Sequence, residues 1–185
     1  MPIQAGGIRM IEELILFLSI FILTLIMLKY WYRIFGYIWI TMCFKKTHDF
    51  FGDTSQLNTP FKAQAYMDYY FTYRKDTEPK HQWQRAEDTY EWMLGDCEDW
   101  ALFAAYCLKH LNPLIFCCYN KNTGHATCLL TYSKFLITLG TKGYNHHSYI
   151  ELPKLAKFFY SDADSYSLYD WNGEFIEHNY NIGGV

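Results

Sequence analysis

The stretch GDCEDWA, residues 95–101, lies where a helix is expected to begin, and it carries Cys97 among three acids. Asp96 can cap this helix, and apolar residues recur at helical spacing up to Leu111. Neighbouring carboxylates raise the pKa of a thiol, whereas the backbone N–H groups at a helix start lower it. The cysteine is therefore either an inert buried thiol or a nucleophile supported by groups from elsewhere in the fold.

Helical patterns precede this stretch, and strand patterns follow it. Thr59-Pro60 is a cap-and-proline signal for a helix to about Arg74, and a short helix is expected over 87–94. The elements expected downstream are strands over 114–120, 125–132 and 135–139, a helix over 152–160, and a hairpin around Asn172-Gly173. Helices followed by an antiparallel sheet predict an α+β fold in which the Cys97 helix packs on the sheet.

The N-terminal part of the chain differs in composition from the rest. Residues 14–28 read LILFLSIFILTLIML, without a charge, and Ile11–Tyr32 has the length of a spanning helix. We therefore predict a single transmembrane helix, with an anchor and juxtamembrane segment over 1–46, a linker over 47–59 and a folded domain over 60–185. A cleaved signal peptide is the alternative, but Glu12 and Glu13 and the lack of a small-residue cleavage site favour an uncleaved anchor.

The charges and the cysteines of the chain indicate its cellular surroundings and exclude some kinds of site. The cations after the apolar run are Lys29, Arg33, Lys45 and Lys46, and Arg9 precedes it. The predicted spanning helix makes the lipid bilayer an expected partner. The positive-inside rule predicts that the C-terminal domain lies on the cytoplasmic side, where unpaired cysteines stay reduced. The six cysteines form no CxxC pair, which disfavours a zinc knuckle, and a net charge of −3 gives no footprint for nucleic acid.

A cysteine nucleophile needs a stabilised thiolate, a base within hydrogen-bond reach, and a group that orients the base. A helix N-terminus supplies part of the first requirement at Cys97. His125 is the candidate base, because it opens a predicted strand directly after Gly124. A helix–sheet seam can bring two such residues together although they are well separated in sequence.

The helix carrying residues 95–101, followed by a strand and then by Gly124-His125-Ala126, resembles the transglutaminase-like cysteine proteinases of the papain-like superfold. The upstream run HQWQRAE, residues 81–87, is similar to a tryptophan-containing segment of the bacterial branch. The resemblance covers about residues 60–140. It implies a Cys–His–Asp triad, with the acid on the strand after the histidine strand.

The chain departs from that pattern at the acid. The strand FLITLG, residues 135–140, has no carboxylate, and Thr138 stands about where the aspartate is expected. A threonine hydroxyl can accept a hydrogen bond from an imidazole but carries no charge to stabilise imidazolium. Asn145 is an alternative orienter. Three later acids that can fold back are Asp162, Asp164 and Asp170.

The resemblance also suggests roles around the cysteine. In some relatives the acids at the positions of Asp96, Glu98 and Asp99 bind calcium, for which carboxylate oxygens are suitable ligands, although helix capping is their commoner use. No other cofactor is required. Trp83 matches a tryptophan near the oxyanion pocket, with a buried packing ring as its alternative role, and Gln84 is a candidate second oxyanion donor beside the Cys97 N–H.

Two functions follow from these residues. The first is a membrane-anchored thiol hydrolase or acyltransferase, of the cysteine peptidase, amidase or transglutaminase type, in which Cys97 attacks an amide bond of a protein or peptide and His125 moves the proton. The second is a catalytically degenerate transglutaminase-like module with a binding or structural role at a membrane. The missing acid and an aromatic content of 20% favour the second. The sequence leaves the substrate and the acyl acceptor open.

Overall fold

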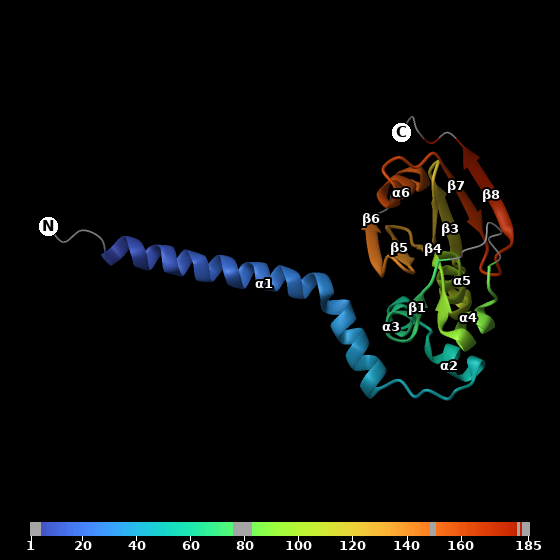
Figure 1. Ribbon diagram of the computed structural model, residues 1–185, viewed down its shortest axis with the longest axis horizontal. Coiled ribbons are helices and arrows are strands. Elements are labelled where there is room, and N and C mark those ends of the chain that lie inside the picture. Colours follow the sequence, from blue (N-terminus) through green and yellow to red (C-terminus); the bar gives the residue numbers. More distant parts are fainter. Residues whose placement is uncertain (1–4, 76–82, 149–150, 181, 183–185) are drawn as a thin grey trace.

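The computed structural model describes residues 5–75, 83–148, 151–180 and 182 of the chain, and these form an α+β structure (Figure 1). The helical elements are α1 (Ala5–Met42), α2 (Phe50–Gln56), α3 (Pro60–Tyr70), α4 (Ala86–Trp92), α5 (Cys97–Cys107), the 3-10 turn η1 (Lys109–Leu111) and α6 (Leu152–Phe159). The strands are β1 (Thr72–Tyr73), β2 (Leu94–Gly95), β3 (Leu114–Tyr119), β4 (Gly124–Thr131), β5 (Phe135–Leu139), β6 (Asn145–Ser148), β7 (Ser165–Tyr169) and β8 (Phe175–Tyr180). The expected helices and strands on either side of residues 95–101 are present, but the helix expected to reach about Arg74 ends at Tyr70, and Thr72–Tyr73 form strand β1.

An antiparallel sheet of six strands, in the order β6-β5-β4-β3-β7-β8, forms the centre of the molecule. Its central strand β3 pairs with both β4 and β7, so Cys117 lies between Ala126 and Ser167. Cys118, the next residue on β3, lies opposite His125. Because side chains alternate along a strand, these two rows face opposite sides of the sheet.

Different helices cover the two faces of the sheet. On one face, α5 packs its small residues Ala101 and Ala104 against Ala126 and Cys128 of β4, which allows a close approach. On the other face, Leu155 of α6 packs among buried residues that include Phe116 and Cys118 of β3 and Leu129 of β4. The sheet is therefore buried on both faces, and β4 packs against α5 on one face and against α6 on the other.

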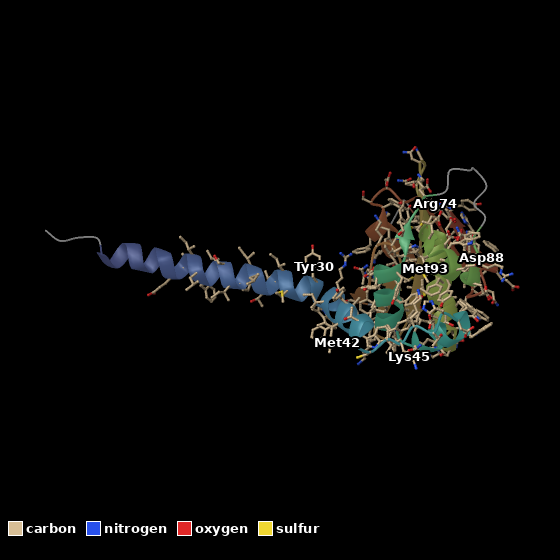
Figure 2. The ribbon with its side chains drawn as sticks, turned by 60° about the horizontal axis from the view of Figure 1, so that its bottom comes forward. Tyr30, Met42, Lys45, Arg74, Asp88 and Met93 are labelled. Atoms are coloured by element: carbon tan, nitrogen blue, oxygen red, sulfur yellow. The ribbon has the colours of Figure 1, made fainter. Side chains whose placement is uncertain are left out.

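The predicted transmembrane helix is wrong. Across the part of the chain that the structure describes, no helix combines the length and the apolar character that crossing a bilayer requires. The predicted single-pass arrangement loses its support with it. Residues 34–42 continue the same helix, α1, whose C-terminal part packs on α3 through Trp31 against Phe61, with ring centroids 6.3 Å apart, and Tyr37 against Tyr69. Figure 2 shows Tyr30 where α1 reaches the body of the protein, while its earlier turns extend away from it.

Caps set the starts of the next two helices. Thr59 caps α3 as predicted, because its side chain accepts a hydrogen bond from the N–H of Lys62. Within the segment predicted to be a linker, the structure has α2, and its Asp53 is fully buried. The Asp53 carboxylate accepts hydrogen bonds from the Thr47 backbone and hydroxyl and from the Tyr90 hydroxyl of α4, at 2.6 to 2.7 Å. This segment is thus fixed to the folded body.

Candidate active site

The start of α5 is held by a closed set of hydrogen bonds. The Asp96 carboxylate accepts from the N–H groups of Glu98 and Asp99, and the Asp99 carboxylate accepts in turn from the Asp96 N–H at 3.0 Å. Asp99 folds back over Gly95, where an added Cβ would lie 2.7 Å from the Asp99 Cβ. The sequence GDxxD therefore encodes a capping box that leaves no room for a side chain at its first position.

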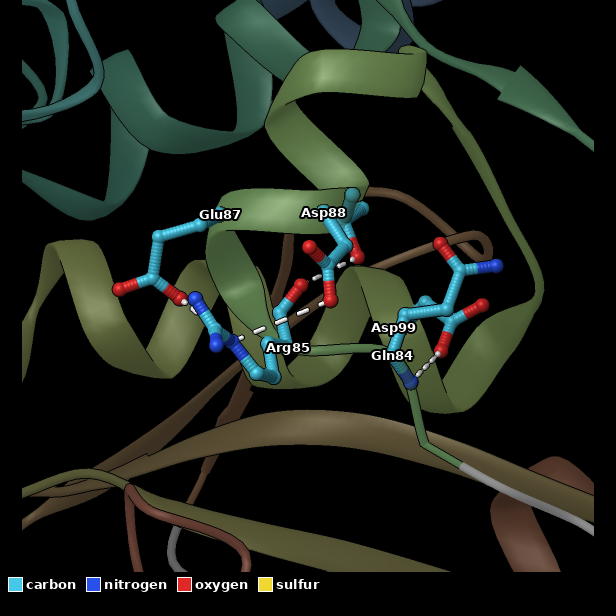
Figure 3. A network of polar contacts seen from close by, with 6 residues as sticks. Gln84, Arg85, Glu87, Asp88 and Asp99 are labelled. Carbon is cyan, nitrogen blue, oxygen red and sulfur yellow. Dashed lines mark hydrogen bonds and ion pairs between the residues drawn. The ribbon is translucent and has the colours of Figure 1, made fainter.

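Asp99 also ties the upstream segment to this helix. Its second carboxylate oxygen accepts a hydrogen bond of 2.8 Å from the backbone N–H of Gln84, as Figure 3 shows. The Asp99 side chain is buried, so its charge is shared among backbone donors and not with solvent. This bond fixes Trp83 and Gln84 next to the start of α5.

Cys97, the first residue of α5, opens into a cleft of about 1080 Å³ at the end of the sheet. The residues that line it are Tyr73, Lys75, Trp83, Asp96, Cys97, Glu98, Trp100, Tyr119, Asn120, Asn122, Thr123, Gly124, His125, Thr141, Lys142, Tyr160 and Tyr169. The two residues predicted to share a proton, Cys97 and His125, thus lie on one cavity. Cys97 reaches the cleft from the face of β4 that α5 covers. His125 reaches it from the other face, where its ring contacts Phe159 of α6.

Burial and charge both oppose ionisation of the Cys97 thiol. The pKa of Cys97 is raised to about 11, mainly by burial, and the carboxylates of Asp96 and Glu98 contribute in the same direction. The backbone N–H of Ala126 acts the other way, by a hydrogen bond to the sulfur that lowers the pKa. The net result is a protonated thiol at neutral pH.

His125 is buried and neutral. Its ring lies against Phe159 of α6, with ring centroids 4.9 Å apart, and no described group hydrogen-bonds its Nε2, which is shielded from solvent. Burial lowers the pKa of His125 to about 4, and the positive charge of Lys142 contributes in the same direction. Among the described residues, no hydrogen bond joins Cys97 to His125. Gaps of this kind are common before substrate binds.

The residues considered as orienters bind elsewhere. The Thr138 hydroxyl lies 3.0 Å from Nε2 of His147 on β6, and Asn145 donates to the carbonyls of Lys142 and Gly143. The three later acids have other partners or positions: Asp162 accepts from Asn120, Asp164 from Ser165, and Asp170 from two backbone N–H groups of its turn. None of these groups contacts the Nε2 of His125.

The three acids considered for calcium are largely occupied by the helix. Asp96 and Asp99 use their oxygens on the capping box and on the Gln84 N–H, and Glu98 lines the cleft. Within residues 5–75, 83–148, 151–180 and 182, no group of three or more His, Cys, Asp or Glu side chains is arranged to hold a metal ion. Calcium binding at these positions stays a prediction.

Trp83 lies on the cleft and Gln84 does not. The Trp83 ring contacts Tyr169 of β7, with centroids 4.6 Å apart, and so forms part of one wall. Gln84 is not among the residues that line the cleft, and its buried Oε1 has no hydrogen-bond partner in the described structure. His81 and Gln82, the first residues of the run that suggested these roles, lie outside the described residues.

Sequence reasoning missed Lys142 and the tyrosines of the cleft. Lys142 follows β5, and antiparallel pairing of β4 with β5 brings that end of β5 beside the start of β4, where His125 lies. Tyr119 and Tyr160 frame Gly124, because the Tyr119 ring occupies the space of a Cβ there and the Tyr160 hydroxyl donates to the Gly124 carbonyl at 3.1 Å. Lys142 carries no signal in the sequence alone, because only the strand register shows that it lies on the same cleft as His125.

No family model matches this chain, and the search of curated proteins found no match either. The chemistry of the site therefore rests on its geometry: a half-buried thiol on a capped helix start, a buried neutral imidazole on the same cleft, and no acid bonded to the Nε2 of that imidazole among the residues that the structure describes.

Proposed function

We propose that the protein is a thiol hydrolase or acyltransferase that cleaves an amide bond through a thioester at Cys97. The single observation that carries the proposal is the shared cleft, which Cys97 and His125 line together at the junction of α5 and β4. The resemblance of residues 95–101 and 124–126 to transglutaminase-like cysteine proteinases supports the same chemistry.

The proposed reaction uses the groups on this cleft. The Cys97 sulfur bonds to the carbonyl carbon while its proton passes to His125, and the C–N bond breaks as the imidazolium returns that proton to the leaving amine. Water or a second amine then attacks the thioester and releases the thiol. Because Nε2 of His125 is buried, Nδ1 is the nitrogen assigned to this transfer.

A second candidate is a degenerate module that binds a ligand in this cleft without turnover. The observation that favours it is the pair of pKa directions: burial raises the pKa of Cys97 to about 11 and lowers that of His125 to about 4. An active thiol–imidazole pair needs the opposite directions, since the nucleophile is the thiolate.

Acetylation by p-nitrophenyl acetate separates the two candidates. The enzyme proposal expects an acetyl group on Cys97, located by mass spectrometry, and a rate of nitrophenolate release that falls at least about tenfold in His125→Ala, in the range of general-base effects. The experiment uses a Cys43→Ser background, because Cys43 is exposed and reacts on its own. His110→Ala, an exposed histidine outside the cleft, is the matched control. Equal acetylation in His125→Ala and the parent would leave only the binding module.

A further inference from the structure

Lys142 lies at the junction of two cavities. It lines the cleft of Cys97 and His125, and it also lines a second cavity of about 640 Å³ between α1 and β6. The other residues on the second cavity are Tyr30, Trp31, Arg33, Tyr144, Asn145 and His146. Among the described residues, Lys142 is the one that lines both cavities.

The Lys142 ammonium has no ion-pair partner among the described residues, and the residue is exposed. The acids on the Cys97 cleft are Asp96 and Glu98, at the start of α5. Asp96 is engaged in the capping box, so its charge is already paired with backbone donors. The cations on this cleft that a negative group on a ligand can meet are therefore Lys75 and Lys142, and Lys142 is the one whose charge acts on His125.

We infer that Lys142 binds a carboxylate of the substrate, so that the chain acts on peptides with an acidic side chain close to the amide that meets Cys97. This inference rests on the proposed function for its reaction and on the two cavities for its geometry.

Substrate binding at this point has a chemical consequence for His125. The positive charge of Lys142 helps to keep the imidazole neutral, and a carboxylate paired with Lys142 offsets that charge. The substrate then supplies part of the stabilisation that an acid of the protein supplies in a complete triad. The other charged groups that line the same cleft are Lys75, Asp96 and Glu98.

The test compares two capped peptides, tri-glutamate and tri-glutamine, binding to the full chain with Cys97→Ser to prevent turnover. Ligand-observed NMR titrations measure both affinities. We expect the glutamate peptide to bind more tightly, and Lys142→Gln to weaken it roughly three- to fivefold, the size of one partly exposed ion pair, without affecting the glutamine peptide. Lys142→Arg should retain the preference, and higher salt should reduce it.

Lys134→Gln is the matched control, because Lys134 is an exposed lysine in the β4–β5 connection that lines neither cavity. Equal affinity for the two peptides, no binding of either, or the same loss in both lysine variants would overturn the inference. The outcome is separate from that of the proposed function: a chain that forms no acetyl-thioester can still prefer the glutamate peptide, and a chain that forms one can lack the preference.

Discussion

The two walls of the cleft differ in how completely their polar groups are satisfied. At the start of α5, Asp96 and Asp99 accept hydrogen bonds from three backbone N–H groups of that turn and from Gln84. At the start of β4, the Nε2 of His125 is buried without a partner in the described structure. The first wall is held by its own hydrogen bonds, whereas no described residue of the second wall orients the His125 imidazole through Nε2. The motif that indicates catalysis in the sequence therefore acts, for the most part, as the capping box that holds the start of α5 and the Gln84 backbone in place.

Breaking this capping box gives the largest expected effect on stability. Asp99→Ala removes the acceptor for the Asp96 and Gln84 N–H groups and leaves both without it, so we expect the free energy of unfolding to fall by about 3 kcal/mol. Urea denaturation followed by circular dichroism measures this. The control is Asp88→Ala, which removes an exposed ion pair with Arg85 and should cost less than about 1 kcal/mol. Similar losses in the two variants would mean that the capping box is not the main role of Asp99.

The buried imidazole makes stability depend on pH. Burial lowers the pKa of His125 from 6.5 to about 4, so between these values the unfolded chain binds a proton that the folded chain does not. Stability from this group is present above pH 6.5 and is lost as the pH falls towards 4, by about 3 kcal/mol in total. His125→Phe, which keeps a ring against Phe159, should flatten that part of the profile.

The measurement is urea denaturation of both chains from pH 7 to pH 4, taken as the difference between them, since burial also lowers the pKa of His147 and gives a slope of the same sign. His110→Gln is the control, because His110 is exposed and lies outside the cleft. Identical profiles for His125→Phe and the parent would show that His125 takes up its proton in the folded chain as readily as in the unfolded one, and the contrast between the two walls would disappear.

Much of the fold could be predicted from the sequence, because its signals are local. The Thr59-Pro60 cap, the helix at Cys97 and the apolar strands β3 and β4 are decided by neighbouring residues, and the structure has them. Strand β6 was missed, since Asn-His-His-Ser lacks the apolar alternation of a strand and is held by pairing with β5. The transmembrane helix was predicted from composition alone, and it is the prediction that the structure contradicts.

The site was harder to predict than the fold, because its contacts depend on register. The resemblance to transglutaminase-like cysteine proteinases put Thr138 about where the aspartate behind the imidazole is expected. Thr138, however, pairs with Leu129 in register and bonds to His147, and it does not line the cleft, whereas Lys142 lines the cleft together with His125. Going from Thr138 on β5 to Lys142, just after that strand, replaces a neutral hydroxyl by a cation. No local pattern in the sequence determines that difference.

Thr138→Val tests whether this threonine has any part in the site. The variant loses the hydrogen bond to His147 in a buried position, so we expect a loss of about 1 kcal/mol in the free energy of unfolding. The alkylation rate of Cys97 by iodoacetamide should stay unchanged, because the bond lies outside the cleft. Thr131→Val, at an exposed position of β4, is the control. A slower reaction of Cys97 in Thr138→Val alone would instead support the predicted role of Thr138 as the orienter of His125.

The smallest effect concerns the charge next to the thiol. Glu98→Gln removes one of the two carboxylates that raise the pKa of Cys97, so the thiolate fraction at a given pH should rise, and alkylation by iodoacetamide should speed up roughly two- to fivefold, with its pH profile moved to lower pH. Glu87→Gln, one helix earlier and outside the cleft, should leave the rate unchanged. The comparison isolates electrostatics from capping, because the Glu98 carboxylate takes no part in the capping box that Asp96 and Asp99 form. A slower reaction in Glu98→Gln would mean that this carboxylate assists the thiol, for example by holding a cation or a substrate amine, and the acids at the start of α5 would then belong to the chemistry of the site as well as to its support.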